Sequence, residues 1–294
     1  MEISTESQAR QRLIERIRLV KAELIIQGSL RYQGIDDPIA SYLGIHVGEA
    51  RLPFSEGNYL PANPPALPYP TIIIDPRKGD TERINFTFFH EVSHHLIRED
   101  DDLYSFLNEY TLNENFQTAL ESFCNLGASE FLVPSQEVRN LIEQQGFRIT
   151  LVEEMDHKYL ASNPAIAIQL AQCASHPCFV LVCDYGVVPD KIDSQASLLE
   201  TWQPTAPQLY VLYATRSPSI TKYSIARFTK IPQGHLLAHC YQNQIAVRGI
   251  AQIPFRSQTV WECDCEAFYY KGKIYAAFHI QPPPPSLSLQ PRLF

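Results

Sequence analysis

The stretch from Thr81 to Arg98 constrains the chain most, because its residue pattern fits one long helix. Asp80 or Thr81 can serve as the N-cap, and Glu82 adds an acid to the first turn. Apolar residues recur at four-residue spacing, at Ile84, Phe88, Val92 and Leu96. This spacing predicts a helix with one buried face.

The same helix carries the sequence His90-Glu91-Val92-Ser93-His94. Two histidines four positions apart project from one helical face, so both imidazoles can bind one zinc ion. Glu91 follows the first histidine and can reach a water at the metal without binding the metal itself. His95 points about 100° away, so we expect it to lie behind the ligands or in solvent. The alternative is a surface helix with a histidine pair and a solvated glutamate.

A catalytic zinc ion needs a third protein ligand, and the helix predicted from residue 113 to residue 132 offers one. We predict Glu121, because it lies mid-helix among apolar and small residues, where an unpaired carboxylate would be costly. Glu114 is the second candidate, and Glu130 is predicted to face solvent. The other interpretation of Glu121 is a buried ion-pair partner.

Length and composition narrow the class of protein. The 294 residues suffice for one large domain or two ordinary ones, and 45% of them are hydrophobic. A net charge of −8 argues against sequence-independent binding of nucleic acid. The polar, acidic first residues do not resemble a signal peptide, and no apolar run is long enough to span a membrane, so we expect a cytoplasmic protein. The seven scattered cysteines contain no C-x-x-C and are expected to be mostly buried free thiols.

Around the central helix, the N-terminal half reads as helices and short strands. We predict helices over residues 5–28 and 38–43, strands over 45–52 and 71–75, and an irregular proline-rich stretch over 61–70. The acidic run at 99–102 is expected to be a solvated turn, with calcium binding as a remote alternative.

Three further helices are predicted over residues 135–145, 150–160 and 164–174, in a helix-turn-helix-like arrangement. Between residues 148 and 175 the basic residues are Arg148 and Lys158, and the third helix has none. A helix that reads DNA needs basic or amide side chains for phosphates and bases, so we favour structural packing and expect no direct DNA binding.

From residue 177 the chain changes to strands, with one helix expected near residues 220–228 and a hairpin turn at 270–273. This pattern predicts a small α+β domain of the sensor type. The proline-rich tail from residue 281 is expected to be disordered. His235 and His239, four apart beside Cys240, form a weak second metal candidate, because the preceding residues make a helix there doubtful. Cys263 and Cys265 face one side of a strand, and a redox or metal role for them is a further alternative.

The segment Arg83-Ile84-Asn85-Phe86-Thr87-Phe88-Phe89-His90-Glu91-Val92-Ser93-His94 resembles the ImmA/IrrE metallopeptidases, whose pattern is R-x-x-F-T-x-A-H-E-x-x-H. A later segment, from Glu121 to Pro134, resembles their second helix, E-x-x-A-N-x-F-A-x-x-L-L-x-P. Glu121 falls on the family's third zinc ligand. Among the departures are Phe89 and Cys124 in place of alanine and Gly127 in place of phenylalanine; they affect packing around the site and not its ligands.

The resemblance implies an α+β protein with a mainly helical, zincin-like metallopeptidase domain and, as in the IrrE (PprI) branch, a C-terminal GAF-like sensor domain. The implied division is residues 1–134 for the peptidase, 135–175 for the helix-turn-helix-like segment, 176–281 for the sensor and 282–294 for the tail. The implied function is zinc-dependent cleavage of a helix-turn-helix repressor of the DdrO type in a DNA-damage or radiation response.

In this mechanism His90, His94 and Glu121 bind Zn²⁺, with Mn²⁺ as an alternative, and Glu91 acts as the catalytic base. Tyr110, His95 and Arg98 are candidates for stabilising the oxyanion. The rival hypothesis is a non-enzymatic, metal-containing regulator that binds a repressor or DNA without cutting. A third hypothesis, a general digestive peptidase, fits the metal site but fits the absent signal peptide poorly.

Overall fold

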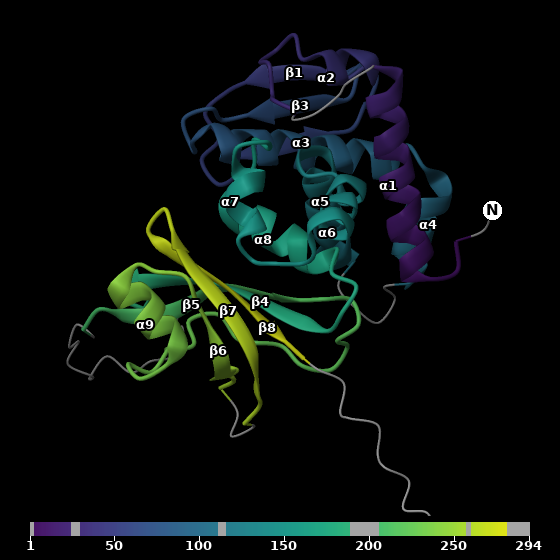
Figure 1. Cartoon of the computed structure of the whole chain (residues 1–294). Coiled ribbons are helices and arrows are strands. Elements are labelled where there is room, and N and C mark those ends of the chain that lie inside the picture. The colour runs from purple at the N-terminus through teal and green to yellow at the C-terminus, as the bar shows by residue number, and fades with distance from the viewer. Residues whose placement is uncertain (1–2, 25–29, 111–115, 189–205, 257–259, 281–294) are drawn as a thin grey trace, which may run out of the picture. The chain divides into compact units, whose positions relative to one another are not determined.

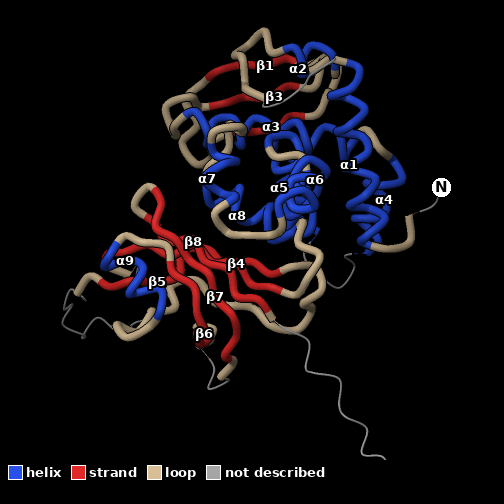
Figure 2. Tube along the Cα trace, in the orientation of Figure 1, coloured by secondary structure: helices blue, strands red, loops and turns tan. Residues whose placement is uncertain are grey.

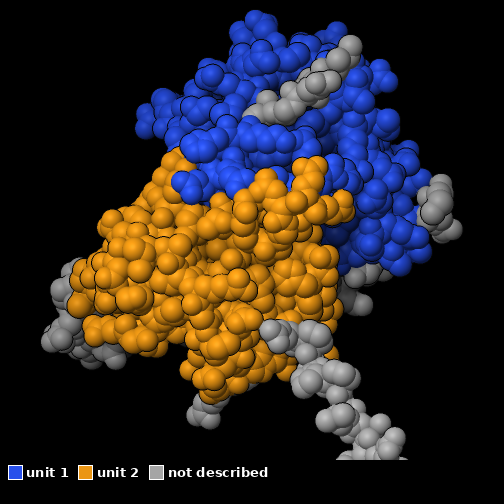
Figure 3. Space-filling model, viewed as in Figure 1, with its two compact units in different colours: residues 1–141, 152–169 blue, residues 142–151, 170–294 orange. Residues whose placement is uncertain are grey.

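The computed structural model describes residues 3–24, 30–110, 116–188, 206–256 and 260–280 (Figure 1). Contacts divide the chain into two compact units (Figure 3): residues 1–141 with 152–169, and residues 142–151 with 170–294. The predicted α+β composition is confirmed, since each unit contains both helices and strands (Figure 2). The proline-rich tail predicted to be disordered lies outside the described residues.

The first unit contains a three-stranded sheet in the order β1-β3-β2. Strand β1 (His46–Glu49) runs parallel to β3 (Thr71–Ile74), and β2 (Gly57–Leu60) pairs with β3 in the antiparallel sense. The sequence predicted β1 and β3 but missed β2, because Gly57 and Asn58 are poor strand formers. The missed strand lies at an edge of the sheet.

The helices described in the N-terminal half are α1 (Glu6–Glu23), α2 (Pro38–Tyr42), α3 (Thr81–Arg98), α4 (Asp101–Tyr110) and α5 (Phe116–Leu132). Helix α3 has the predicted bounds, and the Asp80 carboxylate accepts a hydrogen bond from the Arg83 N–H at 2.9 Å as its N-cap. It packs against β2, and against β3 and α5 (labelled in Figure 1). The helix predicted from residue 113 is described from Phe116 onward.

Aromatic side chains form the contact between α3 and α5. Phe88 and Phe89 are fully buried, and the Phe89 ring stacks on Phe131 with a centroid distance of 4.9 Å. Gly127 on α5 faces Ser93 on α3, and a Cβ on this glycine would lie 2.8 Å from the Ser93 Cβ. The small residue at position 127 therefore lets the two helices approach closely next to the bulky Phe89.

The acidic run after α3 is only partly the solvated turn that the sequence predicts, because Glu99, Asp101 and Asp102 are exposed but Asp100 is buried. The Asp100 side chain is 2% exposed and pairs with Arg12 at 2.8 Å and Arg16 at 3.0 Å. It also accepts a hydrogen bond from the Leu103 N–H at the start of α4. Burial alone would raise the pKa of Asp100, but its hydrogen bonds from both arginines and the Leu103 N–H hold the pKa below the ordinary value.

Three helices follow α5, namely α6 (Ser135–Gln145), α7 (Leu151–Asp156) and α8 (Asn163–Gln172). Helix α6 has the predicted bounds and ends at Gly146, whose φ of 78° favours glycine. The prediction that Glu130 faces solvent is wrong. Its side chain is 1% exposed and accepts a hydrogen bond from the Ser135 N–H at 3.0 Å, and Arg18 lies 3.8 Å away.

The second unit is built on a five-stranded antiparallel sheet in the order β5-β4-β8-β7-β6 (Figure 2). Its strands are β4 (Cys178–Gly186), β5 (Gln208–Arg216), β6 (Val247–Gln252), β7 (Glu262–Tyr270) and β8 (Lys273–His279). The hairpin between β7 and β8 turns at Lys271 and Gly272, with φ angles of 47° and 82°, as the sequence predicts. One sheet face packs against α9 (Leu236–Asn243).

The helix predicted near residues 220–228 is absent from this described stretch, and α9 occurs later. The backbone there bonds to β5 instead: the Phe228 N–H donates to the Val211 carbonyl, and the Val211 N–H donates to the Thr229 carbonyl. These bonds occupy groups that a helix would need.

His235 caps α9 instead of binding a metal. Its Nδ1 accepts from the Leu237 N–H at 3.1 Å, and its Nε2 bonds the Gln252 carbonyl at 2.7 Å. Both ring nitrogens are therefore occupied, which excludes the pairing with His239 as a metal site in this arrangement. Among the described residues, no helix is both long and apolar enough to cross a membrane.

Candidate metal centre

The first unit brings the three predicted metal ligands together from two helices. His90 Nε2 on α3 lies 3.1 Å from a Glu121 carboxylate oxygen on α5, and His94 Nε2 lies 3.6 Å from the other oxygen. The two histidines are 15% exposed and Glu121 is 43% exposed. Two imidazole nitrogens and one carboxylate are a donor set that zinc binds, so the residues present fit such an ion.

Neighbouring side chains orient these donors. Asn125 Oδ1 lies 3.0 Å from His90 Nδ1. With its proton on Nδ1, His90 donates a hydrogen bond to Asn125, and the lone pair on Nε2 is left to bind a metal ion. Gln117 Nε2 donates to Glu121 at 2.8 Å. Burial and the nearby His90 lower the pKa of His94 to about 4, so its imidazole is neutral at neutral pH, as a metal ligand must be.

Glu91, the predicted catalytic base, lies between the ligands on α3 and is 8% exposed. Burial raises the pKa of its carboxyl to about 7, the charge of Glu121 adds to this rise, and a backbone hydrogen bond from Tyr59 opposes it. A carboxyl group with a pKa near 7 can both accept and return a proton at neutral pH.

Edge strand β2 runs along this carboxylate. A Cβ on Gly57 would lie 3.0 Å from both Cγ and Oε1 of Glu91 and 2.6 Å from Thr87 Cγ2. Two positions further on, Tyr59 supplies the backbone hydrogen bond to Glu91. Neither residue is predicted from the sequence, where the one signal for them is a glycine beside a short polar-apolar alternation.

His95 lies behind the ligands, so the solvent-facing alternative is wrong. It is 5% exposed, and its Nδ1 lies 3.1 Å from the Tyr59 hydroxyl. The Tyr59 ring is parallel to His94, at a centroid distance of 6.4 Å, and burial raises the pKa of Tyr59 to about 12. Of the other oxyanion candidates, Arg98 lies over the Tyr104 ring, and the Tyr110 side chain is outside the described part of the structure.

A cleft of about 330 Å³ opens onto the candidate catalytic residues. It is lined by Phe54, Ser55, Glu56, Gly57, Lys78, Phe86, Thr87, His90, Glu91 and Asn125. Phe54 is 99% exposed at its rim. The cleft therefore joins an exposed aromatic group, an edge strand and the predicted base, an arrangement that can hold an extended peptide.

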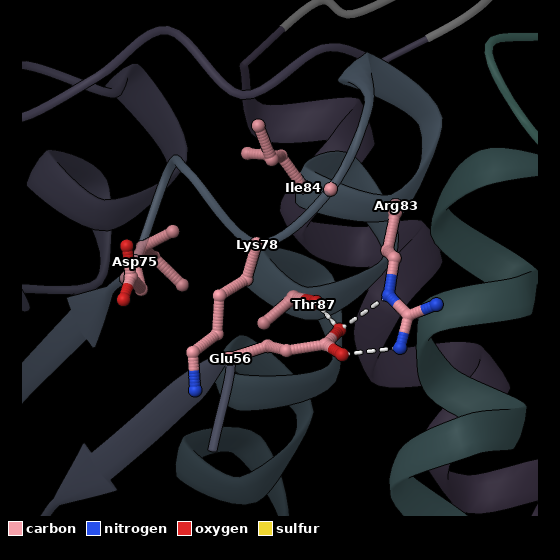
Figure 4. Close-up of a pocket in the computed structure, with 8 residues that line it drawn as sticks. Glu56, Asp75, Lys78, Arg83, Ile84 and Thr87 are labelled. Atoms are coloured by element: carbon pink, nitrogen blue, oxygen red, sulfur yellow. Dashed lines mark hydrogen bonds and ion pairs between the residues drawn. The ribbon is translucent and has the colours of Figure 1, made fainter. Parts of the chain in front are cut away.

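Figure 4 shows a neighbouring pocket, where side chains hold the segment before β2. The Glu56 carboxylate accepts hydrogen bonds from the Arg83 guanidinium, at 2.7 Å from Nε, and from the Thr87 hydroxyl at 3.4 Å. Lys78 Nζ donates to the Ser55 carbonyl at 2.9 Å. Arg83, a residue of the family pattern, thus ties the approach to β2 directly to α3.

Cys124 is a buried free thiol, as the sequence predicts for most of the cysteines, but it also lies beside the predicted metal ligands. Its Sγ and one nitrogen from each of His90 and His94 all lie within 4.8 Å of one another. The side chain is fully buried, and burial, with the charges of Glu121 and Glu91, raises the pKa of its thiol well above the ordinary value. Glu114, the other candidate ligand, lies outside the described residues.

Comparisons with known proteins agree with a metallopeptidase site. Residues 40–169 match the Peptidase_M78 family, described as the IrrE N-terminal-like domain. The resemblance to the ImmA/IrrE metallopeptidases that the motifs indicate is therefore confirmed for this part of the chain, which carries an IrrE N-terminal-like domain.

Two relatives share the name "Radiation response metalloprotease IrrE". The protein of Deinococcus radiodurans is 26% identical over 201 residues, which cover 68% of this chain and 60% of the relative. That of Deinococcus deserti is 25% identical over 197 residues, covering 67% and 66%. The matched part thus spans less than two thirds of either relative.

A solved structure named "Mycobacterium tuberculosis transcriptional regulator" is similar in fold. The match has a TM-score of 0.51 at 12% sequence identity and covers 92% of this chain and 76% of that one. At this identity the likeness shows the fold alone.

Proposed function

We propose that the chain is a zinc-dependent peptidase with its catalytic centre at His90, Glu91, His94 and Glu121. One observation carries the proposal: the Glu121 carboxylate on α5 lies 3.1 Å from His90 Nε2 and 3.6 Å from His94 Nε2 on α3. The buried Glu91 lies beside them, and the surrounding residues match a peptidase family. A purely structural zinc site would have no use for Glu91.

The roles of the residues follow from their positions. His90, His94 and Glu121 hold the ion, which when bound supplies Lewis acidity to the scissile carbonyl. Mn²⁺ is the alternative ion. Glu91 accepts a proton from the attacking water and returns it to the leaving amine, for which a pKa of about 7 is suited. The outer edge of β2, which pairs with β3 on its other side, can align an extended substrate in the cleft.

The proposed substrate is a helix-turn-helix repressor of the DdrO type, and the proposed role is to switch on a radiation or DNA-damage response. Both relatives are named as radiation response metalloproteases, which supports this role. The second unit, with its antiparallel sheet and α9, is proposed to be a GAF-like sensor that regulates cleavage. We also propose that residues 135–175 form a helix-turn-helix-like segment with a packing role.

The test is an incubation of the full chain with a candidate repressor, with and without zinc, alongside Glu91→Gln. Glu143→Gln, which changes an exposed glutamate on α6, is the matched control. We expect zinc-dependent cutting at a single site that survives in Glu143→Gln and is lost in Glu91→Gln. Binding without cutting at any metal concentration would favour a non-enzymatic regulator.

A further inference from the structure

The metal centre has a sulfur atom at its inner side. Cys124 lies three residues after Glu121, on the same face of α5, and its Sγ is within 4.8 Å of nitrogens from both His90 and His94. Cys124 is fully buried, whereas the Glu121 side chain is 43% exposed. The two donors from α5 thus differ in their access to solvent.

We infer that Cys124 is a fourth protein ligand of this metal centre. The donor set of the chain is then two histidines, one glutamate and one cysteine, instead of two histidines and one glutamate. This inference rests on the proposed function, because it takes the ion to bind at His90 and His94.

The chemistry of the donors supports the assignment. Zinc binds cysteine sulfur at about 2.3 Å and histidine nitrogen at about 2.0–2.1 Å, so sulfur and nitrogen ligands of one tetrahedral ion lie about 3.5 Å apart. The Cys124 Sγ and the two imidazole nitrogens lie within 4.8 Å of one another, so these side chains need only a small shift to reach this spacing. Soft thiolate ligands also favour zinc and other thiophilic ions over manganese.

A fourth protein ligand changes what the site can do. Sites with four protein ligands are closed and structural, whereas catalytic zinc sites have three and keep one position open. The Cys124 side chain therefore keeps the site latent, and peptide cleavage requires this side chain to leave. Cys124 is a regulatory ligand on this view, since it strengthens metal binding and lowers the basal peptidase activity.

Cobalt(II) absorption tests the ligand directly, because the ion itself reports its donors. Visible d–d bands report binding at the site, and a near-ultraviolet sulfur-to-cobalt charge-transfer band reports a thiolate ligand. We expect the full-length chain to show both. Cys124→Ala is expected to keep the d–d bands and lose the charge-transfer band, His94→Ala is expected to lose both, and the buried control Cys183→Ala is expected to keep both.

Cadmium affinity and cleavage give a second readout. We expect Cys124→Ala to bind Cd²⁺ at least about tenfold more weakly, equivalent to about 1.4 kcal/mol, and to cleave the repressor faster than wild type. Cys124→Ser, which is close to isosteric, replaces Cys124→Ala if the alanine variant fails to fold, and it is also expected to lose the band.

The outcomes separate the inference from the proposed function. Cobalt bound to wild type without a charge-transfer band, or a band that survives in Cys124→Ala, would overturn the fourth ligand and leave the peptidase proposal intact. If wild type bound no cobalt at all, the metal centre and this inference would both be wrong.

Discussion

Gly57 on edge strand β2 lies against Glu91 on α3 so closely that a Cβ at position 57 would stand 3.0 Å from the Glu91 Oε1. The strand therefore forms a wall that fixes the predicted base, and the absence of a side chain at Gly57 is what allows the strand to do so. This contact between a glycine and a carboxylate places β2 beside the proposed catalytic base, at the strand edge proposed to bind the substrate.

Gly57→Ala is predicted to displace Glu91 or the strand, because the new methyl group would also meet Thr87 Cγ2 at 2.6 Å. A misplacement of about 1 Å can cost on the order of a hundredfold in rate, so we expect a loss of this size in kcat. Cobalt or zinc affinity should be unchanged, since the ligands are untouched. Steady-state cleavage and metal titration measure the two quantities.

The matched control is Gly48→Ala on β1 of the same sheet, where an added Cβ meets nothing within 4 Å. It should cleave at the wild-type rate. Equal activity in the two alanine variants would show that β2 does not position Glu91.

Asn125→Ala is predicted to weaken metal binding. Asn125 is hydrogen-bonded to His90 Nδ1 at 3.0 Å and so holds the ring with Nε2 towards Glu121. Loss of such a supporting hydrogen bond typically costs about 10- to 100-fold in metal affinity. Competition with a chromophoric chelator measures the change. Asn125→Asp keeps an acceptor and should retain most of the affinity; an equal loss in both variants would contradict this role.

Gly127→Ala is predicted to destabilise the contact between α3 and α5, because the added Cβ would lie 2.8 Å from the Ser93 Cβ and closer still to its hydroxyl. Overpacking of this kind typically costs about 1–3 kcal/mol in the free energy of unfolding. Urea denaturation measures it. Ser93→Ala removes the nearest atom, so the double variant should be less destabilised than the sum of the two single variants. Simple additivity would argue against the clash.

Asp100→Asn is predicted to lower the free energy of unfolding by about 2 kcal/mol at neutral pH, because Asp100 accepts charge-assisted hydrogen bonds from Arg12 and Arg16. The folded-state pKa of Asp100 lies below its unfolded value of about 3.9. Its stabilisation is therefore complete above that value and is lost as pH falls through the lower, folded-state pKa.

Denaturation series from pH 7 down to pH 3 would check this sign. The difference in unfolding free energy between wild type and Asp100→Asn should be largest at neutral pH and should shrink in the acid range. A difference that grew on acidification would contradict the assigned ion pairs.

The sequence by itself determined the elements whose signals are local. The N-cap at Asp80, the four-residue apolar spacing and the two histidines on one turn fixed α3 and the orientation of its ligands. Gly146 marked the end of α6, and Lys271 with Gly272 marked the hairpin. In each case the residues that form the feature are neighbours in the chain, so their spacing carries the information.

Only the tertiary structure decided what depends on distant partners. Gly57 and Asn58 are weak strand formers, yet they belong to β2 because β3 pairs with them, and that strand brought Gly57 to Glu91. The buried state of Asp100 depends on two arginines from α1. The stretch predicted as a helix at residues 220–228 instead leads into backbone hydrogen bonds of Phe228 and Thr229 with Val211 on β5. The approach of α5 to α3 likewise turned Cys124 from an ordinary buried thiol into a neighbour of the metal ligands. Burial and long-range hydrogen bonds set these outcomes, and neither is encoded in local spacing.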